Sequence, residues 1–402
     1  MKYPISLTVA AIGVATGLWM IQPEDPERRN PFDREDSALA PQILPPEQGL
    51  TLALERKGAG DAPHVLLVTG LKAGQINAID LTAQGLTSKT DFFDVMAEIG
   101  GDRLADLASA AVPTVTRGFQ DLLPAAGPAS RHVASGTNFR EHQEETNAQS
   151  VFNFPKFGTA TPPVTTVSFE AGELLDYEVE ICTRFDRDIT RIEDFDAARK
   201  GFFLCGDFSD RAVLSRMIDP DDFDSGSGFS DAKSGPGHFP SGGLFVVPHD
   251  WKAFVDQERL MTLVNGDLRQ DTRASGMILS FRALVEQVLS DTESTRFLYQ
   301  GRNWHLVEDG IIARDQVLMS GTSEGVIFIP PTTRQILRGA VRYVTYGSFL
   351  RGGSAYDAVI QSFLSEEHKA GRYLQPGDQV VHASSSMGQI NVEVRAADSD
   401  QR

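Results

Sequence analysis

The chain has 402 residues, of which 41% are hydrophobic, and this is enough for one large or two ordinary globular domains. Its 55 acidic side chains outnumber its 37 basic ones and give a formal net charge of −18. Because phosphate contacts need clustered Lys and Arg, this charge excludes nucleic acid from the expected partners.

The N-terminal segment differs from the rest of the chain. After Lys2 no charge occurs before Glu24, and residues 5–21 are mostly apolar. A positive end followed by an apolar stretch of nearly membrane-spanning length predicts a signal anchor or signal peptide at 1–22. We therefore expect a protein that is membrane-anchored or exported to the periplasmic side. The alternative is a cytoplasmic protein in which this segment is a buried helix.

The next two segments predict a linker and a small domain. Six prolines among alternating acids and arginines at 23–48 are typical of an extended tether. Residues 49–126 predict a small N-terminal α+β unit, because β-type runs precede an amphipathic stretch. The elements expected in it are strands at Leu50–Leu54, Val65–Val68 and Ile76–Leu81 and a helix at Asp91–Ala108.

Residues 127–396 predict a larger, strand-rich domain with short helices. Residues 331–373 are expected to be mostly helical, because apolar residues recur there at helical spacing. The other elements expected late in this domain are an amphipathic helix at Ser280–Leu289 and strands at Gly321–Pro330, Gln379–Ala383 and Ile390–Val394.

The chain contains two cysteines, Cys182 and Cys205, and each lies in an apolar strand-like run. Free Cys behaves as a small core hydrophobe, so we expect buried thiols. A single disulfide is the alternative, and its formation is not deducible from spacing alone.

Three acids mark a candidate metal site. Glu178 and Glu180 are two apart in a run that predicts a strand, so both carboxylates point to the same face. Asp207 follows another apolar run and would complete a set of oxygen ligands, which suits Mg²⁺, Mn²⁺ or Ca²⁺ better than zinc or copper. The alternative is a pair of solvent-facing glutamates on a half-exposed strand.

Further polar residues accompany these acids. His142 and Glu145 are neighbours on a predicted short helix, an arrangement that makes histidine a general base for water. Lys233 lies in a Gly/Pro-rich loop, where it could neutralise an anionic substrate. Residues 263–270 predict a hairpin with an Asn-Gly turn, and Thr322 lies in a glycine-flanked turn whose backbone N–H groups could hold a carboxylate.

Taken together, these segments and their order along the chain resemble the motif pattern of the fumarylacetoacetate hydrolase family. Seven family motifs are matched along the chain, with Gly206 in place of the usual Asn, Ser323 in place of Pro, and Thr137 where many members have Arg. The matched segments are 138–145, 175–180, 206–211, 233–248, 264–270, 321–326 and 374–378.

The resemblance implies a fold and a metal site. The fold class is α+β: a mixed β-roll catalytic domain at 127–396 with the small N-terminal α+β unit. The helical segment at 331–373 would be an insertion, because compact members of the family have no counterpart to it. Glu178, Glu180 and Asp207 would hold one divalent metal, with Mg²⁺ expected first and Mn²⁺ or Ca²⁺ as alternatives. A homodimer is also expected from the family.

The resemblance also implies catalytic roles. His142, aligned by Glu145, would activate a water, and Lys233 would stabilise the charge on a substrate oxygen. The residues expected to contact the keto-acid substrate, or to brace the ligands, are Arg211, Gln270 and Thr322.

The function that follows is a metal-dependent hydrolase that cleaves a C–C bond in an acylpyruvate- or fumarylacetoacetate-like β-diketo acid. A decarboxylase, isomerase or dehydratase of a 2-keto acid, such as a 2-keto-3-deoxy sugar acid, would use the same metal site. A non-catalytic metal-binding module is a further alternative. A serine hydrolase is disfavoured, because the Gly-x-Ser-x-Gly match at 321–325 is followed by an apolar run and two prolines instead of a helix.

Overall fold

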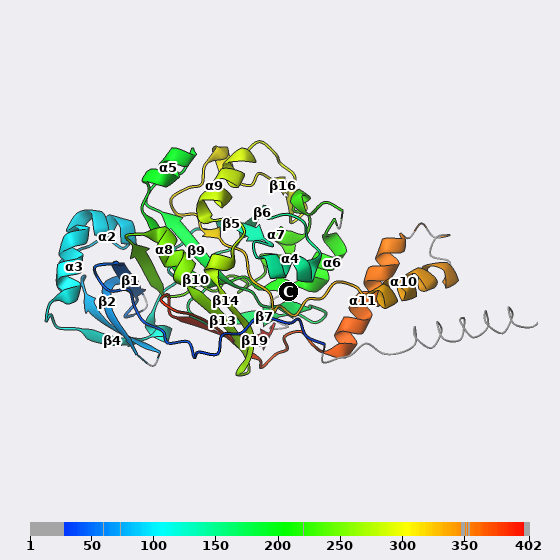
Figure 1. Cartoon of the computed structure of the whole chain (residues 1–402), viewed down its shortest axis with the longest axis horizontal. Helices are drawn as coiled ribbons and strands as arrows, with labels where there is room; N and C mark the ends of the chain where they lie inside the picture. The colour runs from blue at the N-terminus through cyan, green and yellow to red at the C-terminus, as the bar shows by residue number, and fades with distance from the viewer. Residues whose placement is uncertain are drawn as a thin grey trace, which may run out of the picture.

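The computed structural model describes residues 28–397, except for 59, 73, 220, 347–349, 351 and 353 (Figure 1). The signal anchor predicted at 1–22 lies outside the described residues. Within the described part of the chain, none of the helices has the length and apolar character needed to span a bilayer.

A ten-stranded mixed sheet forms the centre of the molecule. All of its neighbouring strands are antiparallel except β17 and β5, which are parallel. Because β1 pairs with β12, the small N-terminal unit continues the sheet of the larger domain. The strand order is β4 (Val115–Gly118), β3 (Gln75–Asp80), β2 (His64–Lys72), β1 (Gly49–Glu55), β12 (Leu244–Pro248), β10 (Lys200–Gly206), β9 (Val179–Phe185), β17 (Leu318–Met319), β5 (Arg131–Gly136), β6 (Phe152–Phe157).

A five-stranded sheet packs against this first sheet. The two sheets are in close contact, since the ring of His382 in the five-stranded sheet lies against the backbone of Gly206 in β10. The order is β14 (Asp267–Arg273), β13 (Arg259–Val264), β18 (Gln379–Ser384), β19 (Gln389–Ala396), β7 (Val164–Phe169). Two further pairs are β11 (Ser209–Asp210) with β8 (Leu175–Asp176) and β15 (Phe297–Tyr299) with β16 (Arg302–Trp304).

The predicted hairpin is confirmed. Strands β13 and β14 meet at Asn265 and Gly266, whose φ angles of 53° and 88° are the left-handed pair that a type I′ turn requires.

One predicted helix is two helices in the structure. Gly100 has φ 91°, which no α-helical residue adopts, and it separates α2 (Phe92–Ile99) from α3 (Gly101–Ser109). The predicted amphipathic helix is confirmed as α9 (Phe281–Ser290), and the Ser280 side chain caps it by accepting from the backbone N–H of Ala283. The other helices of this body are α4 (Arg140–Thr146), α5 (Ile192–Ala197), α6 (Arg211–Met217), α7 (Phe229–Lys233) and α8 (Trp251–Gln257), with short 3₁₀ turns at Phe119–Asp121, Phe223–Ser225, Ala274–Gly276 and Glu308–Gly310.

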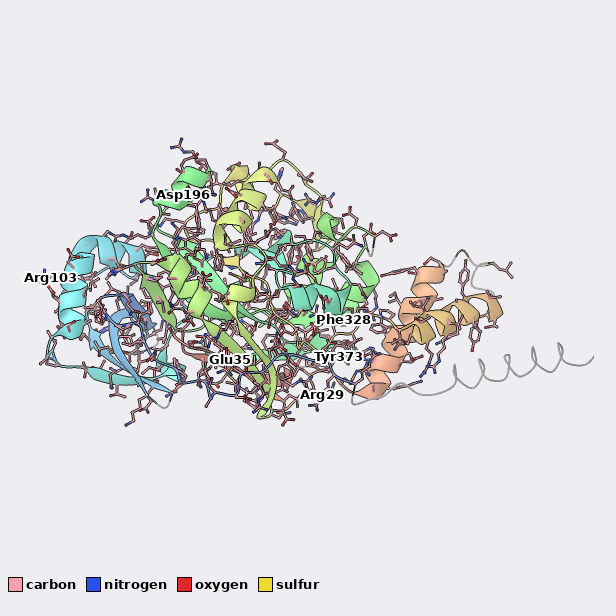
Figure 2. All side chains as sticks on the ribbon, in the orientation of Figure 1. Arg29, Glu35, Arg103, Asp196, Phe328 and Tyr373 are labelled. Atoms are coloured by element: carbon pink, nitrogen blue, oxygen red, sulfur yellow. A yellow bond between two sulfur atoms is a disulfide. The ribbon has the colours of Figure 1, made fainter. Side chains whose placement is uncertain are left out.

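The helices expected at 331–373 are present as a pair, α10 (Thr333–Thr345) and α11 (Ala355–Ala370). They extend away from the sheets at the right of Figure 1, and we call them the helical arm. The two helices approach closely at Gly339, where a Cβ atom would lie 2.4 Å from the Cα atom of Val359. Phe328 and Tyr373 lie where the arm joins the body (Figure 2).

The strand predicted at Gly321–Pro330 is wrong, because this segment is irregular. Gly321 and Gly325 adopt φ angles of 81° and 95°, which interrupt extended backbone. Instead of joining a ladder, the N–H groups of Ile327 and Phe328 donate to the carboxylate of Asp176, at 2.9 and 3.1 Å.

The segment expected to be a tether lies against the body over residues 28–48. Asn30 donates to the carbonyl oxygens of Val326 and Phe328, at 2.9 and 2.8 Å. Further along, Glu35 pairs with Arg273 beside the β13–β14 hairpin, and Figure 2 labels Glu35 there. The segment is extended, as predicted, but it is fixed to the domain at several points.

The prediction of free thiols is wrong. Cys182 in β9 and Cys205 in β10 form a disulfide, with their Cα atoms 5.9 Å apart. The two strands pair with Cys205 opposite Glu180, so the cysteines are diagonal neighbours on adjacent strands. This register is a tertiary property that the sequence does not display.

Candidate metal and catalytic site

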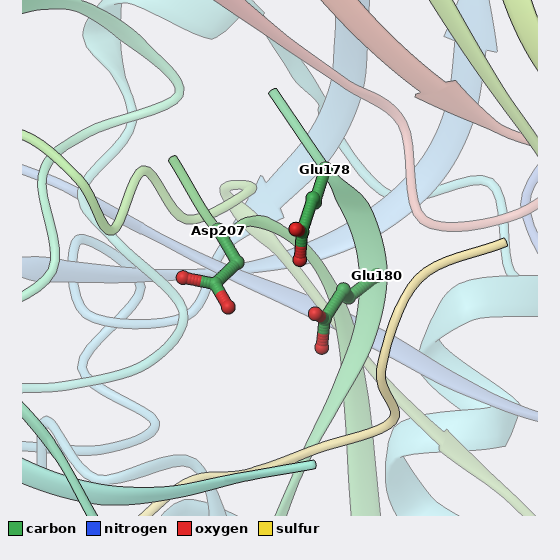
Figure 3. A group of neighbouring side chains, drawn as sticks. All are labelled: Glu178, Glu180 and Asp207. Carbon is green, nitrogen blue, oxygen red and sulfur yellow. The ribbon is translucent and has the colours of Figure 1, made fainter. Parts of the chain in front are cut away.

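Three buried carboxylates converge at the ends of two paired strands. Glu178 directly precedes β9, Glu180 lies in β9, and Asp207 directly follows β10. The backbone N–H of Asp207 donates to the carbonyl of Glu178 at 2.9 Å, which joins the two strand ends. One carboxylate oxygen from each of the three acids lies within 4.8 Å of the others (Figure 3). The prediction of solvent-facing glutamates is excluded, because both are buried.

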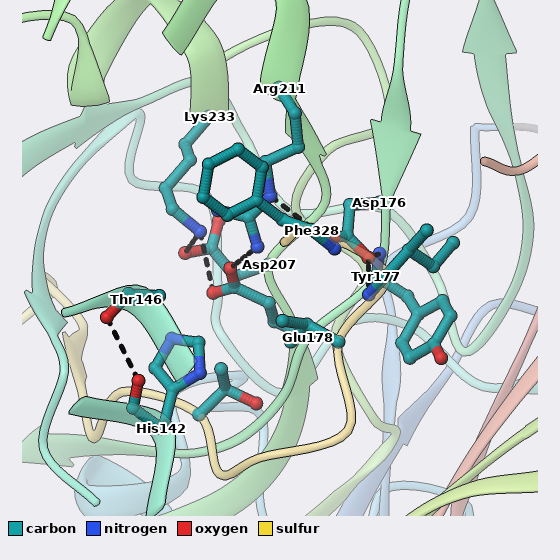
Figure 4. A network of polar contacts seen from close by, with 12 residues as sticks. His142, Thr146, Asp176, Tyr177, Glu178, Asp207, Arg211, Lys233 and Phe328 are labelled. Atoms are coloured by element: carbon teal, nitrogen blue, oxygen red, sulfur yellow. Dashed lines mark hydrogen bonds and ion pairs between the residues drawn. The ribbon is translucent and has the colours of Figure 1, made fainter. Parts of the chain in front are cut away.

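Cationic side chains hold two of these acids in place (Figure 4). Lys233 Nζ lies 2.6 Å from Glu178 Oε2 and 2.9 Å from Asp207 Oδ2, so it bridges them. Lys156 Nζ lies 2.6 Å from Asp207 Oδ1, and Arg211 Nη2 lies 2.5 Å from Glu178 Oε1. These ion pairs neutralise much of the acid charge of the buried carboxylates.

The ion pairs also determine the charge states. Burial alone would raise the pKa of Asp207, but the ammonium groups of Lys156 and Lys233 outweigh it and lower that pKa. Burial would lower the pKa of Lys233, yet Asp207 and Glu178 raise it, so this lysine is a cation. For Lys156, burial outweighs the attraction of Asp207 and lowers the pKa.

Glu180 is bound differently from the other two acids. Its Oε2 accepts from the backbone N–H of Gly321 at 2.8 Å, whereas its Oε1 has no hydrogen-bond partner among the described residues. Burial, together with repulsion from Asp207 and Glu178, raises its pKa well above the ordinary value. A buried oxygen without a donor is a costly arrangement that a bound cation would relieve.

The residues present fit a hard divalent cation. All three candidate ligands offer carboxylate oxygens, the donors that Mg²⁺, Mn²⁺ and Ca²⁺ prefer. Glu178 and Asp207 keep free lone pairs in spite of their ion pairs, because each carboxylate oxygen has two. Oε1 of Glu180, which has no partner among the described residues, would supply the third ligand atom.

Helix α4 supplies a histidine–carboxylate pair. His142 Nδ1 lies 2.8 Å from Glu145 Oε2, and Glu145 Oε1 accepts from the backbone N–H of Gly325 at 2.7 Å. Burial raises the pKa of Glu145, although the hydrogen bond from His142 opposes this. With Nδ1–H donated to the carboxylate, Nε2 is the ring atom able to accept a proton.

Of the three remaining predicted residues, two line the cavity that adjoins the site and one lies behind it. Arg211 lies between Asp176 and Glu178, with Nε 2.8 Å from Asp176 Oδ2. Gln270 donates to Thr322 Oγ1 at 3.0 Å and accepts from Thr262 Oγ1 at 2.9 Å, so it braces the glycine-flanked turn from behind. Arg211 and Thr322 line the adjoining cavity, and Gln270 does not.

Sequence reasoning missed Lys156 and His382. Lys156 is a fully buried cation in β6, and the signal for it is a lone lysine inside the apolar run 152–157. His382 lies against Gly206: a Cβ atom there would be 3.1 Å from its Nε2 and 2.8 Å from Pro240 Cγ. The Asn that the family pattern carries at this position therefore does not fit beside His382.

A cavity of about 590 Å³ adjoins the site. Its lining includes His142, Glu178, Arg211, Lys233 and Thr322, and it continues to the helical arm. The structure therefore places His142, one candidate metal ligand and three predicted polar residues around one space, while Glu145 reaches it only through His142.

Comparisons with known proteins identify a family match and similar folds. The family description "Fumarylacetoacetate (FAA) hydrolase C-terminal" matches residues 131–395. A structure from Mycobacterium smegmatis assigned as HpcE is 20% identical and aligns with a TM-score of 0.53 over 86% of this chain and 100% of that one. A structure from Mycobacterium abscessus assigned as a 2-hydroxyhepta-2,4-diene-1,7-dioate isomerase is 14% identical, with a TM-score of 0.52 over 87% and 99%. Among curated proteins no match is found.

Proposed function

The chain belongs to the fumarylacetoacetate hydrolase family, and from this premise we propose that it hydrolyses a C–C bond in a β-diketo acid of the acylpyruvate or fumarylacetoacetate type. The observation that carries the proposal is that His142, which lines the same cavity as Glu178 and Lys233, is hydrogen-bonded to Glu145. A general base for water and a site for a keto acid are the two parts that such a hydrolysis requires.

The metal site has a defined place in this proposal. Glu178, Glu180 and Asp207 would hold the cation, with Mg²⁺ proposed first and Mn²⁺ or Ca²⁺ as alternatives. When bound, a divalent cation supplies a Lewis acid that stabilises negative charge on keto-acid oxygens.

The protein residues move the protons. His142 Nε2 takes a proton from water, and the water oxygen forms a bond to the distal carbonyl carbon. The C–C bond breaks, its electron pair passes to the CH₂ carbon, and a proton completes a methyl group. The sum is R–CO–CH₂–CO–COO⁻ + H₂O → R–COO⁻ + CH₃–CO–COO⁻ + H⁺. Lys233, held as a cation, offsets the charge that develops on the substrate.

Glu145 is a positioning residue in this scheme. Its hydrogen bonds to His142 and Gly325 fix the imidazole relative to the glycine-flanked turn. Arg211 and Thr322 line the cavity and are proposed to contact the substrate, whereas Gln270 is proposed to act through Thr322.

Isomerisation is the second candidate, because the same metal site can stabilise the same enolate without adding water. The Mycobacterium abscessus structure assigned as an isomerase has the same fold, and that likeness concerns the fold alone. The His142–Glu145 pair supports hydrolysis because it can activate water, but it does not decide the matter, since an isomerisation also needs a group that moves a proton. Decarboxylation, dehydration and metal binding without turnover are the remaining alternatives.

The test is turnover of acylpyruvates by the full chain with Mg²⁺, with released pyruvate reduced by lactate dehydrogenase and NADH. We expect pyruvate from the wild type, no metal binding in Glu178→Ala, and metal binding without turnover in His142→Ala. Isomer formation without pyruvate would favour the second candidate. Metal binding with no conversion of any keto acid would favour the non-catalytic module.

We also propose a location and an assembly state. The Cys182–Cys205 disulfide is of the kind that persists in oxidising compartments, which agrees with export directed by residues 1–22. Alkaline phosphatase fused after residue 48 would be active if residues 1–22 direct export of the protein, and inactive if the protein stays in the cytoplasm. Sedimentation would test the proposed homodimer.

A further inference from the structure

The cavity beside the site has two chemically different ends. His142, Glu178, Arg211 and Lys233 line one end. The rest of the lining is largely apolar, and among the described residues it carries no further charged side chain. The apolar residues on which the argument depends are Leu214, Ile218, Phe229, Ile336, Val359 and Ile360.

The helical arm supplies much of the apolar end. Tyr356 Oη in α11 donates to the carbonyl oxygen of Ser215 in α6 at 2.9 Å, and the rings of Phe328 and Phe363 meet edge to face with centroids 6.3 Å apart. These contacts hold the arm beside the mouth of the site. The arm's apolar residues therefore have a fixed position relative to the carboxylates.

The apolar end is not filled by the protein itself. Ile336 lines the cavity and is 47% exposed, although it lies on the side of α10 that faces the site. Exposed apolar surface of this kind is buried favourably by an apolar ligand. A cavity of about 590 Å³ has the volume of a site for a small organic molecule considerably larger than pyruvate.

From this geometry we infer that the substrate is an acylpyruvate whose acyl group is a long aliphatic chain lying against the helical arm. The inference rests on the proposed function and narrows its substrate class. The keto-acid end of such a molecule matches the cationic residues, and its chain matches the apolar wall. A substrate of the fumarylacetoacetate type ends in a second carboxylate, which would be desolvated there without a lining cation.

The experiment uses the full chain with Mg²⁺ and a series of acylpyruvates from acetyl to decanoyl. We expect kcat/KM to rise about fourfold for each added methylene until the wall is covered, which corresponds to ~0.8 kcal/mol per buried CH₂. An acylpyruvate of equal length that ends in a carboxylate should be a poorer substrate than its methyl-ended counterpart.

A matched pair of variants on α10 tests whether the helical arm contacts the acyl chain of the substrate. Ile336 lines the cavity, whereas Val341 does not, and their exposed fractions are similar at 47% and 41%. Ile336→Asp should reduce the ratio of kcat/KM for decanoylpyruvate over acetylpyruvate by about tenfold or more. Val341→Asp should preserve that ratio.

The outcomes separate this inference from the proposed function. If acylpyruvates are hydrolysed but kcat/KM does not depend on chain length, the aliphatic substrate is overturned and the hydrolase stands. If no acylpyruvate is turned over, the proposed reaction fails. The aliphatic binding site is then tested by calorimetric titration of Mg²⁺-loaded protein with pyruvate and with 2-oxodecanoate. Tighter binding of the longer acid supports the aliphatic site, and equal binding overturns it.

Discussion

Replacing Glu180 by Gln should stabilise the metal-free protein while abolishing its response to Mg²⁺. Glu180 Oε1 is buried close to two other carboxylates and has no hydrogen-bond partner in the described part of the chain. A Gln side chain keeps an oxygen to accept from Gly321 and replaces the buried oxygen that has no donor by an amide N–H group, which can donate to a neighbouring carboxylate. Removing an unsatisfied buried polar group is worth about 1–3 kcal/mol.

This free energy translates into a measurable shift of the melting temperature. At roughly 2.1 cal/mol/K per residue, unfolding 402 residues as one unit changes the entropy by about 0.8 kcal/mol/K. The gain is therefore about 1–4 °C for metal-free Glu180→Gln. In contrast, Mg²⁺ at a hundred times its Kd should stabilise the wild type by about 2.7 kcal/mol, or roughly 3 °C, and should leave the variant unchanged.

The assay is calorimetric melting of metal-free and Mg²⁺-loaded protein, with Glu193→Gln as the control. Glu193 is exposed on α5, and its substitution should change stability by less than about 0.5 kcal/mol. A lower melting temperature for metal-free Glu180→Gln would refute the account of its unpartnered oxygen. An equal Mg²⁺ shift in wild type and variant would refute its role as a ligand.

Three further predictions concern stability. Gly206→Ala should lower the free energy of unfolding in urea by about 1–3 kcal/mol, because its Cβ would lie against Pro240 and the ring of His382. The loss should be smaller in a His382→Ala background, and equal losses in both backgrounds would contradict the steric account. Replacing both Cys182 and Cys205 by Ser should lower the free energy of unfolding by about 3 kcal/mol, since the bond closes a segment of 23 residues, and an unchanged urea midpoint would show that the disulfide contributes nothing. Burial raises the pKa of Glu258 to about 7, so the folded state holds a proton that the unfolded state releases near 4.5. The resulting stability is full below about pH 4.5 and is lost as the pH rises through 7, so Glu258→Gln should gain up to about 3 kcal/mol relative to wild type between pH 5 and pH 8; parallel pH profiles would contradict this.

Much of the architecture was predictable because local patterns decide it. The Asn-Gly turn, the Ser280 cap and the apolar periodicity of the arm each specify an element through nearby residues. The predictions failed where a distant partner decides the outcome. The backbone after Gly325 bonds to the Asp176 carboxylate and not to a strand, and the two cysteines meet only because β9 and β10 pair in one particular register.

In the candidate site, too, local patterns were predictive and contacts with distant residues were not. The motif spacing predicted that Glu178, Glu180 and Asp207 converge, since each lies at or beside a strand end. It did not predict that Lys156 supports Asp207 from another strand, because nothing near Lys156 in sequence marks it as a partner. Nor did it predict that His382 takes the space beside Gly206, which depends on the packing of two sheets.

The most direct test of the central claim is the fate of water oxygen during turnover. The full chain with Mg²⁺ is incubated with an acylpyruvate in H₂¹⁸O, and the carboxylate product R–COO⁻ is examined by mass spectrometry. The account predicts one ¹⁸O atom in that carboxylate, formed only when Mg²⁺, His142 and Glu178 are all present. An isomer of unchanged composition, CO₂ release, or an unlabelled carboxylate would contradict it.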